Sequence, residues 1–450
     1  MNKKPNIILL IADSLRWSDN LIDELKSIFG AGTLFNNAFS NFPGTEVSNI
    51  SLLCSKVKWI LFENGKFTHV GPSLKGTGYT NGKFMTIPNH NIEKKEAHKI
   101  YDKFEAVYDN PGVKNNNQRI IGMMDKIPLA LAEDVNKYAL NWISRIDNPL
   151  FLILNYFEPH YPYIYLENGN LKSSKLNRKE VWKLKFKKGK FNEKETERIK
   201  NAKKHYIKSY KYLFEEIKKL INNLKKKGLY ENSIIIFLSD HGESFLDSPN
   251  KANIENIGHG GSLHNSVIQV PLFFKLPGDK EFKTNNSTVG VIDVAPTILD
   301  LINLHIPKNF EGKSLKKAVV SNSELSHDIF CEDDCGSREH QIYEQQLGLI
   351  SGKCKLIVNN TKNKLIRGNE LYNLKKDPEE KNNIITNKEA LQPIKKTFQE
   401  YFRSMKKKNI IKMKFCSAKF RFNEIIRNFK NKTNKDEKQI KERLKALGYI

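Results

Sequence analysis

The sequence predicts an α/β protein with a mostly parallel central sheet, helices on both faces of that sheet, and a smaller C-terminal α+β subdomain. Three continuous apolar runs of strand length, at residues 7–12, 149–157 and 233–238, carry this prediction. Such runs are typical of parallel strands that are buried on both faces. The chain of 450 residues also exceeds the size at which one hydrophobic core usually stops growing. We therefore expect one large domain with a smaller one attached.

The segment between the second and third runs has the periodicity of a helix. Apolar or aromatic residues recur every three or four positions from Ile199 to Leu224, and three lysines and Gly228 follow. Lysines in the last turn and a glycine just after it are common at helix ends. Strand, helix and strand in this order predict an α/β crossover unit of a parallel sheet.

The sequence pattern changes in the C-terminal third of the chain. A polar stretch at residues 277–287 precedes residues 289–304, which predict a strand that turns into a helix through Pro296. From about Leu325, short strands and turns predict the smaller subdomain. The predicted divisions are a catalytic domain at 1–324, a small subdomain at 325–405, and a basic segment with a terminal helix at 406–450.

The formal net charge of +25 indicates attraction to polyanions such as nucleic acid, anionic lipid or acidic glycan. Many of the lysines lie in Lys/Asn-rich patches, so we assign part of this excess no specific role. The first apolar run is much shorter than the ~18 residues of a membrane span and no cleavage site follows it. Five scattered cysteines lack zinc-ligand spacing. We expect a soluble, cytoplasmic protein with reduced thiols, and keep Cys331 with Cys335 as an alternative redox or metal clip.

Polar clusters follow all three predicted strands. They are residues 13–16 after the first strand, 158–160 after the second and 240–243 after the third. Open parallel sheets bind ligands beyond the carboxyl ends of their strands. The three clusters therefore predict a functional site at one edge of the sheet.

Asp13 and Asp240 each come directly after an apolar strand, and His241 follows the second of them. Two carboxylates at one sheet edge repel each other unless a cation lies between them. Carboxylates and imidazole are also common ligands of divalent metals. Two plain alternatives remain open: residues 239–243 as a polar turn that begins a helix, and Asp13 as the N-cap of a helix starting at Leu15.

Thr45 is a second candidate for a catalytic role. Apolar residues at helical spacing follow it, which places Thr45 at a helix N-terminus. The plain interpretation is an N-cap, which Ser48 supports. The functional interpretation uses the same backbone N–H groups and helix dipole to stabilise an attacking alkoxide and an ester oxyanion. A metal at the predicted site would activate the otherwise weakly nucleophilic hydroxyl.

Taken in order, these motifs resemble the sulfatase family of the alkaline phosphatase superfamily over nearly the whole chain. The matching segments are KPNIILLIADSLR (4–16), FNNAFSNFPGTEVSNISLL (35–53), LNYFEPHYPY (154–163), IIIFLSDHGE (234–243), GHGGSLHNSVIQVPLFF (258–274), VIDVAPTILDL (291–301), ELYNLKKDPEEKNN (370–383) and RLKALGY (443–449). Each match alone is weak or moderate, and their order makes the set strongly specific.

The resemblance implies a role for each matching position. The implied metal ligands are Asp13, Asp240 and His241, the implied nucleophile is Thr45, and the implied contacts to the ester oxygens or the leaving group are His160 and His259. Arg16 would support the end of the first strand. The implied cofactor is one divalent ion (Ca, Mn, Mg or Zn), with a second metal near His259 as an alternative. For His160 a rigid structural loop stays open, and for His264 we favour a structural role.

The sequence departs from the family pattern at the nucleophile. Sulfatases that use formylglycine need Cys or Ser in a C/S-x-P-S-R motif, whereas residues 45–49 here are Thr-Glu-Val-Ser-Asn. Threonine cannot be converted to that aldehyde, and a threonine nucleophile is typical of superfamily branches that act on phosphodiesters. Ser14 also stands where a second aspartate is common.

We therefore expect a metal-dependent hydrolase or transferase of sulfate or phosphate esters that works through a covalent Thr45 intermediate, with phosphodiester chemistry somewhat favoured. The charge favours an anionic glycan or lipid-linked substrate and leaves peripheral membrane contact open, and we do not expect nucleic acid as a partner. The alternative function is a decayed sulfatase-like protein that binds polyanions through its basic segment at 406–435.

Overall fold

The structure is a computed structural model of the 450-residue chain. It describes residues 4–57, 68–86, 97–107, 130–174, 176, 178–185, 187, 191–247, 257–333, 336–337, 342–361 and 368–407. The predicted basic segment and terminal helix lie almost entirely outside these residues, and so does Cys335.

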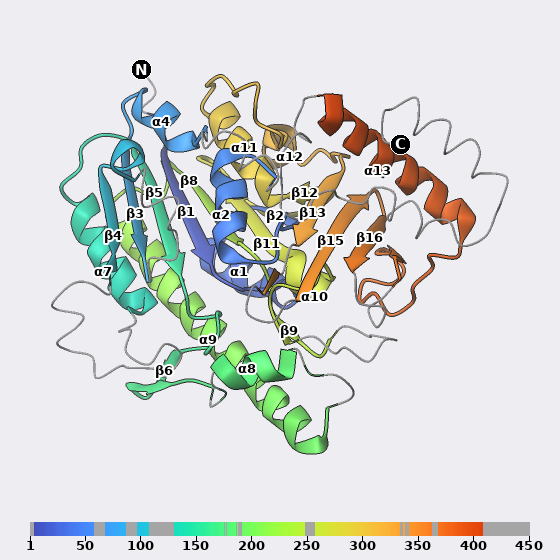
Figure 1. Ribbon diagram of the computed structural model, residues 1–450. Coiled ribbons are helices and arrows are strands. Elements are labelled where there is room, and N and C mark those ends of the chain that lie inside the picture. Colours follow the sequence, from blue (N-terminus) through green and yellow to red (C-terminus); the bar gives the residue numbers. More distant parts are fainter. Residues whose placement is uncertain are drawn as a thin grey trace.

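An eight-stranded sheet forms the centre of the molecule (Figure 1). Its strands, in spatial order, are β12 (Phe282–Gly290), β2 (Gly32–Phe39), β11 (Gln269–Lys275), β8 (Ser233–Ser239), β1 (Asn6–Ala12), β5 (Leu150–Tyr156), β3 (Thr80–Met85) and β4 (Lys103–Ala106). Within this sheet β11 runs antiparallel to both of its neighbours, and the other pairings are parallel. The predicted mostly parallel sheet is confirmed.

The three apolar runs form the middle of the sheet, as predicted. Strand β1 lies between β5 and β8, with Ile8 opposite Leu152 on one side and Ile235 on the other. Alternate residues of β1 enter two different cores: Ile8 belongs to one and Leu9 to the other. Residues 7–12 are apolar at every position, so burying both faces of β1 requires both cores.

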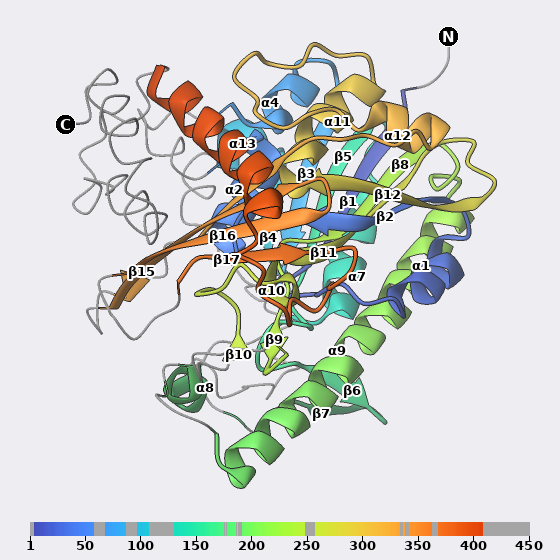
Figure 2. The same ribbon diagram turned by 90° about the vertical axis from the view of Figure 1, so that its right-hand side faces the viewer.

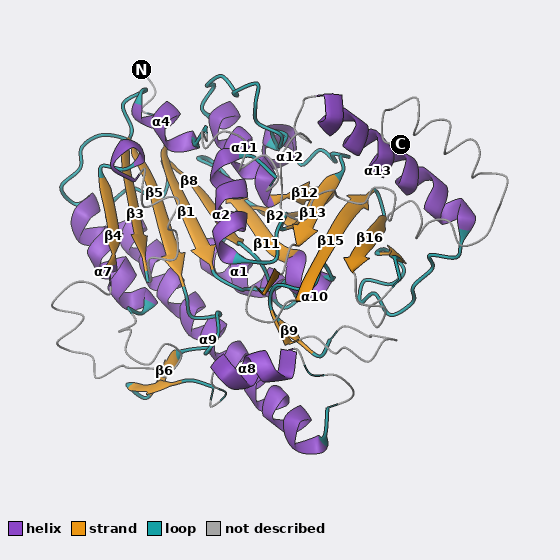
Figure 3. Ribbon diagram, in the orientation of Figure 1, coloured by secondary structure: helices purple, strands orange, loops and turns teal. Residues whose placement is uncertain are grey.

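Helices cover both faces of the sheet (Figures 2 and 3). Three of them pack on one face: α1 (Leu21–Phe29), α7 (Ala132–Ile143) and α9 (Glu193–Lys226). Four others pack on the opposite face: α2 (Thr45–Cys54), α4 (Val70–Lys75), α11 (Val294–Leu301) and α12 (Lys316–Ser321). The helix predicted from residues 199–224 is confirmed as the inner part of α9.

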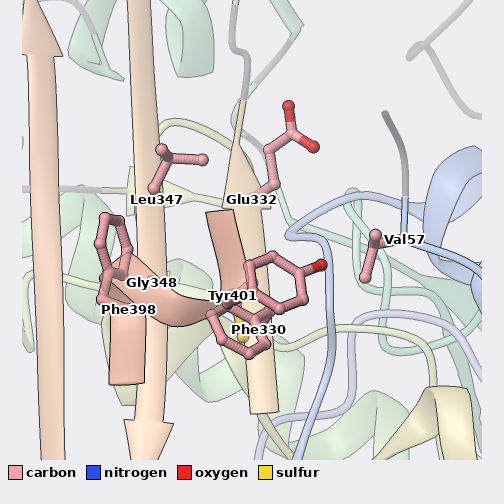
Figure 4. A pocket seen from close by; sticks show the side chains of 8 residues that line it. Val57, Phe330, Glu332, Leu347, Gly348, Phe398 and Tyr401 are labelled. Atoms are coloured by element: carbon pink, nitrogen blue, oxygen red, sulfur yellow. The ribbon is translucent and has the colours of Figure 1, made fainter. Parts of the chain in front are cut away.

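A smaller antiparallel sheet lies against the large domain. Its strands are β13 (Ile329–Asp333), β15 (Ile342–Ser351), β16 (Cys354–Thr361) and β17 (Glu370–Asn373), and β14 (Gly336–Ser337) pairs with β15. One face packs on the large domain through Ile357 and Leu263, and α13 (Lys388–Lys407) covers the other face. Figure 4 shows a small, mainly apolar cavity there, lined by Phe398 and Tyr401 of α13.

Short elements extend from the edge of the central sheet. They are the hairpins β6 (Tyr165–Glu167) with β7 (Asn170–Lys172) and β9 (Ser244–Phe245) with β10 (Ile257–Gly258), the helices α8 (Arg178–Lys185) and α10 (Asn265–Ile268), and the 3-10 turn η2 (Val291–Asp293). None of the helices in the described part of the chain combines the length and apolar character of a membrane span.

Two local predictions differ from the structure. The strand before η2 begins at Phe282, so most of it lies in the polar stretch that was expected to precede it. This strand has alternating exposed and buried positions and pairs with β2 along one edge of the sheet, which its polar residues permit. The alternative that Asp13 caps a helix starting at Leu15 is wrong, because the helix begins at Leu21.

Candidate active site

The predicted metal ligands meet at the carboxyl ends of two adjacent strands. Asp13 directly follows β1, and Asp240 and His241 directly follow β8. All three side chains are buried, and one ligand atom from each lies within 4.8 Å of the others. The pairing of β1 with β8 brings these residues together from positions more than 200 residues apart.

The chemistry of these three side chains fits a divalent cation. Burial, and then repulsion from Asp240, raises the pKa of Asp13 well above its ordinary value. Two buried carboxylates this close are costly unless a positive charge offsets them. The Nδ1–H of His241 donates to the carbonyl of Gly242 at 3.0 Å, so Nε2 carries the lone pair that faces the carboxylates. Two carboxylates and one imidazole lone pair form a suitable donor set.

Thr45 lies directly against this cluster. Its Oγ1 is 3.0 Å from Nε2 of His241 and 3.4 Å from each carboxylate oxygen of Asp13. Thr45 is also the first residue of α2, so the free backbone N–H groups of that helix end surround it. The hydroxyl is therefore held between the predicted metal ligands and the positive end of a helix dipole.

The expectation that Thr45 caps α2 is wrong in detail. The N-cap is Gly44, and no side chain accepts a hydrogen bond there. Ser48 is not a capping partner either: its Oγ donates to the carbonyl of Asp240 at 2.6 Å and contacts Oγ of Ser40 at 2.9 Å. These bonds fix α2 against the end of β8, which leaves the Thr45 hydroxyl available to the carboxylates.

Two further polar residues complete the surroundings of Asp240. The backbone N–H of Ser14 donates to Oδ1 of Asp240 at 3.2 Å, and Nδ2 of Asn49 lies 3.5 Å from Oδ2. Asn49 also donates to the carbonyl of Thr45 at 2.9 Å. Ser14 and Asn49, which depart from the family pattern, thus hold the Asp240 carboxylate, and Asn49 also holds the backbone of Thr45.

The two predicted histidines lie beside the cluster. The ring centroid of His259 is 4.4 Å from that of His241 and 4.8 Å from that of His160. The Nδ1–H of His160 donates to the carbonyl of Tyr161 at 2.7 Å, so Nε2 takes no part in this hydrogen bond. Burial is the main cause that lowers the pKa of both rings, of His160 to about 3 and of His259 well below its ordinary value.

Glu243 is a site residue that the sequence argument did not single out. Its Oε2 lies 3.0 Å from Nδ1 of His259, and Tyr163 donates to its Oε1 at 3.2 Å. Burial raises the pKa of this carboxyl. The sequence could have indicated Glu243, because it lies three residues after Asp240 in a segment that was already assigned to the site.

Arg16 faces away from the triad. Its guanidinium pairs with Asp247, and its backbone N–H donates to the Tyr206 hydroxyl at 2.9 Å. A Cβ on Gly242 would come within 2.9 Å of the Arg16 Cβ, so the loops after β1 and β8 meet closely there. The expectation that Arg16 supports the end of the first strand stays a prediction.

His264 has a structural place. It is buried, its Nε2 lies 2.9 Å from Oε2 of Glu370 in the small sheet, and its Nδ1 lies 2.9 Å from the hydroxyl of Ser262. The favoured interpretation of His264 thus agrees with its contacts, which join the two sheets.

Two protein-family models match this chain. The model described as "Sulfatase" matches residues 5–304, and the model described as "N-sulphoglucosamine sulphohydrolase, C-terminal" matches residues 261–408. The first covers the central sheet and all candidate site residues, and the second covers the small sheet and the whole of α13.

Several curated proteins are similar in sequence. An ulvan-active sulfatase of Formosa agariphila is 25% identical over 350 residues, which are 70% of this chain and 65% of that protein. An arylsulfatase of Clostridium perfringens is 27% identical over 196 residues, 42% of this chain and 37% of that protein. A lipoteichoic acid synthase of Staphylococcus saprophyticus is 35% identical over 101 residues, 22% of this chain and 15% of that protein. These matches span less than two thirds of each relative.

Solved structures share the fold. A protein in complex with its substrate D-glucosamine-2-N,6-O-disulfate has a TM-score of 0.66 at 18% identity, with 90% of this chain and 98% of that chain covered. A phosphonate monoester hydrolase of Agrobacterium radiobacter has a TM-score of 0.65 at 16% identity, with 90% and 96% covered.

Proposed function

This chain belongs to the sulfatase family, and from that premise we propose that it is a metal-dependent hydrolase or transferase of sulfate or phosphate esters with Thr45 as its nucleophile. The observation that carries the proposal is the position of the Thr45 hydroxyl, which lies 3.0 Å from His241 and 3.4 Å from Asp13 at the N-terminus of α2. A plain helix cap would not require this contact.

Asp13, Asp240 and His241 would hold the divalent cation. When bound, such an ion neutralises negative charge on an attacking oxygen and on an ester oxygen. The residues themselves orient the nucleophile, because Asn49 holds the Thr45 carbonyl and Ser48 fixes α2 against β8. The backbone N–H groups at the start of α2 offer further stabilisation to an ester oxyanion.

In the proposed reaction, Thr45 Oγ1 forms a bond to the sulfur or phosphorus atom as the bond from that atom to the leaving oxygen breaks. Burial keeps His160 and His259 neutral in the free protein. The negative charge of a bound ester favours their protonated forms, in which Nε2–H would donate to an ester oxygen or to the leaving group. The oxygen of a water molecule, or of an acceptor hydroxyl in a transferase, then bonds to the sulfur or phosphorus atom as the bond from that atom to Thr45 Oγ1 breaks, and the proton of the attacking hydroxyl restores the threonine hydroxyl.

The nucleophile favours a phosphodiester over a sulfate ester. Threonine cannot provide the formylglycine aldehyde, and the residues that follow Thr45 do not form the conversion motif. The relatives are divided in their names between sulfatases, a phosphonate monoester hydrolase and lipoteichoic acid synthases. For the substrate we propose an anionic glycan or a lipid-linked anionic ester, which the net charge of +25 also favours.

The first experiment compares four nitrophenyl esters: a sulfate, a phosphate monoester, a phosphodiester and a phosphonate monoester. Metal-stripped protein would be tested after Mn, Zn, Mg or Ca is restored. We expect metal-dependent turnover with preference for the phosphodiester or phosphonate. Thr45→Ala should reduce turnover by at least about 1,000-fold, because the nucleophile is lost, and should leave the metal content unchanged.

Thr45→Ser is the matched control, because it keeps a hydroxyl at the same position and should retain measurable turnover. Equal activity in wild type and Thr45→Ala would refute the mechanism. Preference for the sulfate ester would instead identify sulfatase chemistry without formylglycine. The alternative of a decayed, polyanion-binding protein rests on residues 406–435, which lie outside the described part of the chain apart from residues 406 and 407.

A further inference from the structure

The backbone around His259 has little conformational constraint of its own. Gly258 and Gly260, on either side of His259, have φ angles of 81° and 71°. Glycine adopts this left-handed region readily, and it also leaves one backbone conformation for another more easily than other residues do. Two contacts from the site hold the loop: Gly258 pairs with Ser244 in the β9–β10 hairpin, and Oε2 of Glu243 lies 3.0 Å from Nδ1 of His259. Each of these contacts comes from the segment that directly follows β8.

Helix α8 adds a third contact, from a different part of the chain. Figures 1 and 2 show α8 beyond the end of the central sheet, on the same side as β9 and β10. The ammonium of Lys185, the last residue of α8, donates to the backbone carbonyl of His259. Val181, one turn earlier, lies 3.9 Å from the position of a Cβ added to Gly258. The helix therefore touches both His259 and the residue before it.

Helix α8 is itself fixed to the large domain. Its residue Leu184 is buried in the core that contains α9, and Val181 packs against the same core. Glu180 also pairs with Arg198 of α9 at 2.7 Å. These contacts give the Lys185 side chain, which is half-buried, a fixed point from which it reaches the loop.

Resting on the function proposed above, we propose that Lys185 is a positioning residue of the reaction, which holds the backbone of His259 so that the imidazole meets the ester. A hydrogen bond from an ammonium to a carbonyl is stronger than one between neutral groups. A displacement of about 1 Å at a reacting group can cost about 100-fold in rate. Loss of this one bond should therefore slow the reaction, whereas the predicted metal ligands and the start of α2 would still bind the ester.

The kinetic test removes the ammonium and keeps the apolar stem. In Lys185→Met, kcat for the preferred nitrophenyl ester should fall about 10- to 100-fold, and KM should change less than about threefold. Lys185→Arg should recover part of kcat, because a guanidinium can also donate to the carbonyl. The matched control is Lys183→Met, a change at an exposed lysine of the same helix, which should keep the wild-type kcat. A wild-type kcat in Lys185→Met would overturn the proposal.

A double-mutant cycle shows whether Lys185 acts through His259. His259→Ala removes the ring that the bond positions, so adding Lys185→Met to this variant should leave its kcat unchanged. If the second substitution reduces kcat as much as it does in the wild type, the ammonium acts on the ester or on the whole fold. That result would rule out a positioning role.

Backbone amide hydrogen exchange tests the same contact without turnover. Exchange in the peptide that contains residues 257–263 is followed by mass spectrometry on metal-loaded protein. Lys185→Met should raise the exchange rate there at least about threefold, and Lys183→Met should not. Unchanged exchange in Lys185→Met would refute the hold of Lys185 on the loop, even in an active enzyme. Faster exchange in a protein that hydrolyses none of the esters would support this hold and would count against the proposed function alone.

Discussion

At the scale of single residues, the site depends on polar side chains that are buried and each held by a specific partner. Thr45 contacts His241 and Asp13, and Glu243 contacts His259. Glu158 is a related case nearby: Oε1 accepts from the backbone N–H of Ala132 at 2.5 Å, and no partner contacts Oε2 within the described residues. Burial raises the pKa of Glu158 to about 7.

The raised pKa of Glu158 predicts a pH-dependent stability. Because the folded protein binds this proton more tightly than the unfolded chain, the free energy of unfolding should fall as pH rises from about 4.5 through about 7. The shift corresponds to about 3 kcal/mol at most. Glu158→Gln removes the titration, so the loss of stability between pH 5 and pH 8, measured by urea unfolding, should be smaller in this variant. An identical loss in both proteins would contradict the assignment.

At the scale of elements, α2 carries the nucleophile candidate and its placement decides the site. This short helix is fixed by the buried hydroxyl of Ser48, which reaches the carbonyl of Asp240 at the end of β8. The apolar face of α2 rests on the sheet through Leu52 and Leu53. The helix therefore connects the core to the candidate site.

Removal of this connection should weaken both stability and turnover. Ser48→Ala leaves the Asp240 carbonyl without its bond, and we expect a loss of about 1–3 kcal/mol in the free energy of unfolding. Turnover of the preferred nitrophenyl ester should fall as well, because Thr45 lies one turn earlier on the same helix. Ser321→Ala, a change at an exposed serine near the end of α12, serves as the control. Wild-type stability in Ser48→Ala would show that α2 is held by its apolar contacts alone.

At the scale of the whole molecule, buried polar bonds join the small sheet to the large domain. Lys355 of β16 is fully buried and its ammonium lies 2.5 Å from Glu380 and 2.8 Å from the side chain of Asn265. Asn265 begins α10, just after His264, which contacts Glu370 of the small sheet. The small sheet therefore supports the segment that leads from the site into β11.

The buried pair at Lys355 gives a prediction for the intact fold. Lys355→Met would leave Glu380 buried without its positive partner, which typically costs about 3–5 kcal/mol of stability. Lys353→Met, an exposed change on the same hairpin, is the matched control and should unfold like the wild type. Equal urea midpoints for both variants would mean that Glu380 finds another partner.

Metal binding should also appear as whole-molecule stability. A divalent cation that binds the folded site adds about 2.7 kcal/mol when its concentration is 100 times the dissociation constant. We expect Mn or Zn to raise the Tm of metal-stripped protein and Asp240→Asn to abolish this increase. A Tm increase that is unchanged in Asp240→Asn would place the bound metal elsewhere.

The sequence by itself predicted the three central strands, α9, the sheet edge that carries the site, and the residues Asp13, Thr45, Asp240 and His241. These features depend on local periodicity and on the position of polar residues after apolar runs, which are visible in the order of residues. The sequence also placed His160 and His259 through the family resemblance.

Only the tertiary structure decided how these side chains meet. The contact of Glu243 with His259, the bond from Ser48 to Asp240 and the ion pair of Arg16 with Asp247 depend on loops from different strands. Lys185 is likewise visible in the sequence, but its contact with the backbone carbonyl of His259 comes from the packing of α8. Long-range contacts of this kind are fixed by the sheet order and by buried hydrogen bonds, and no local pattern in the sequence encodes them.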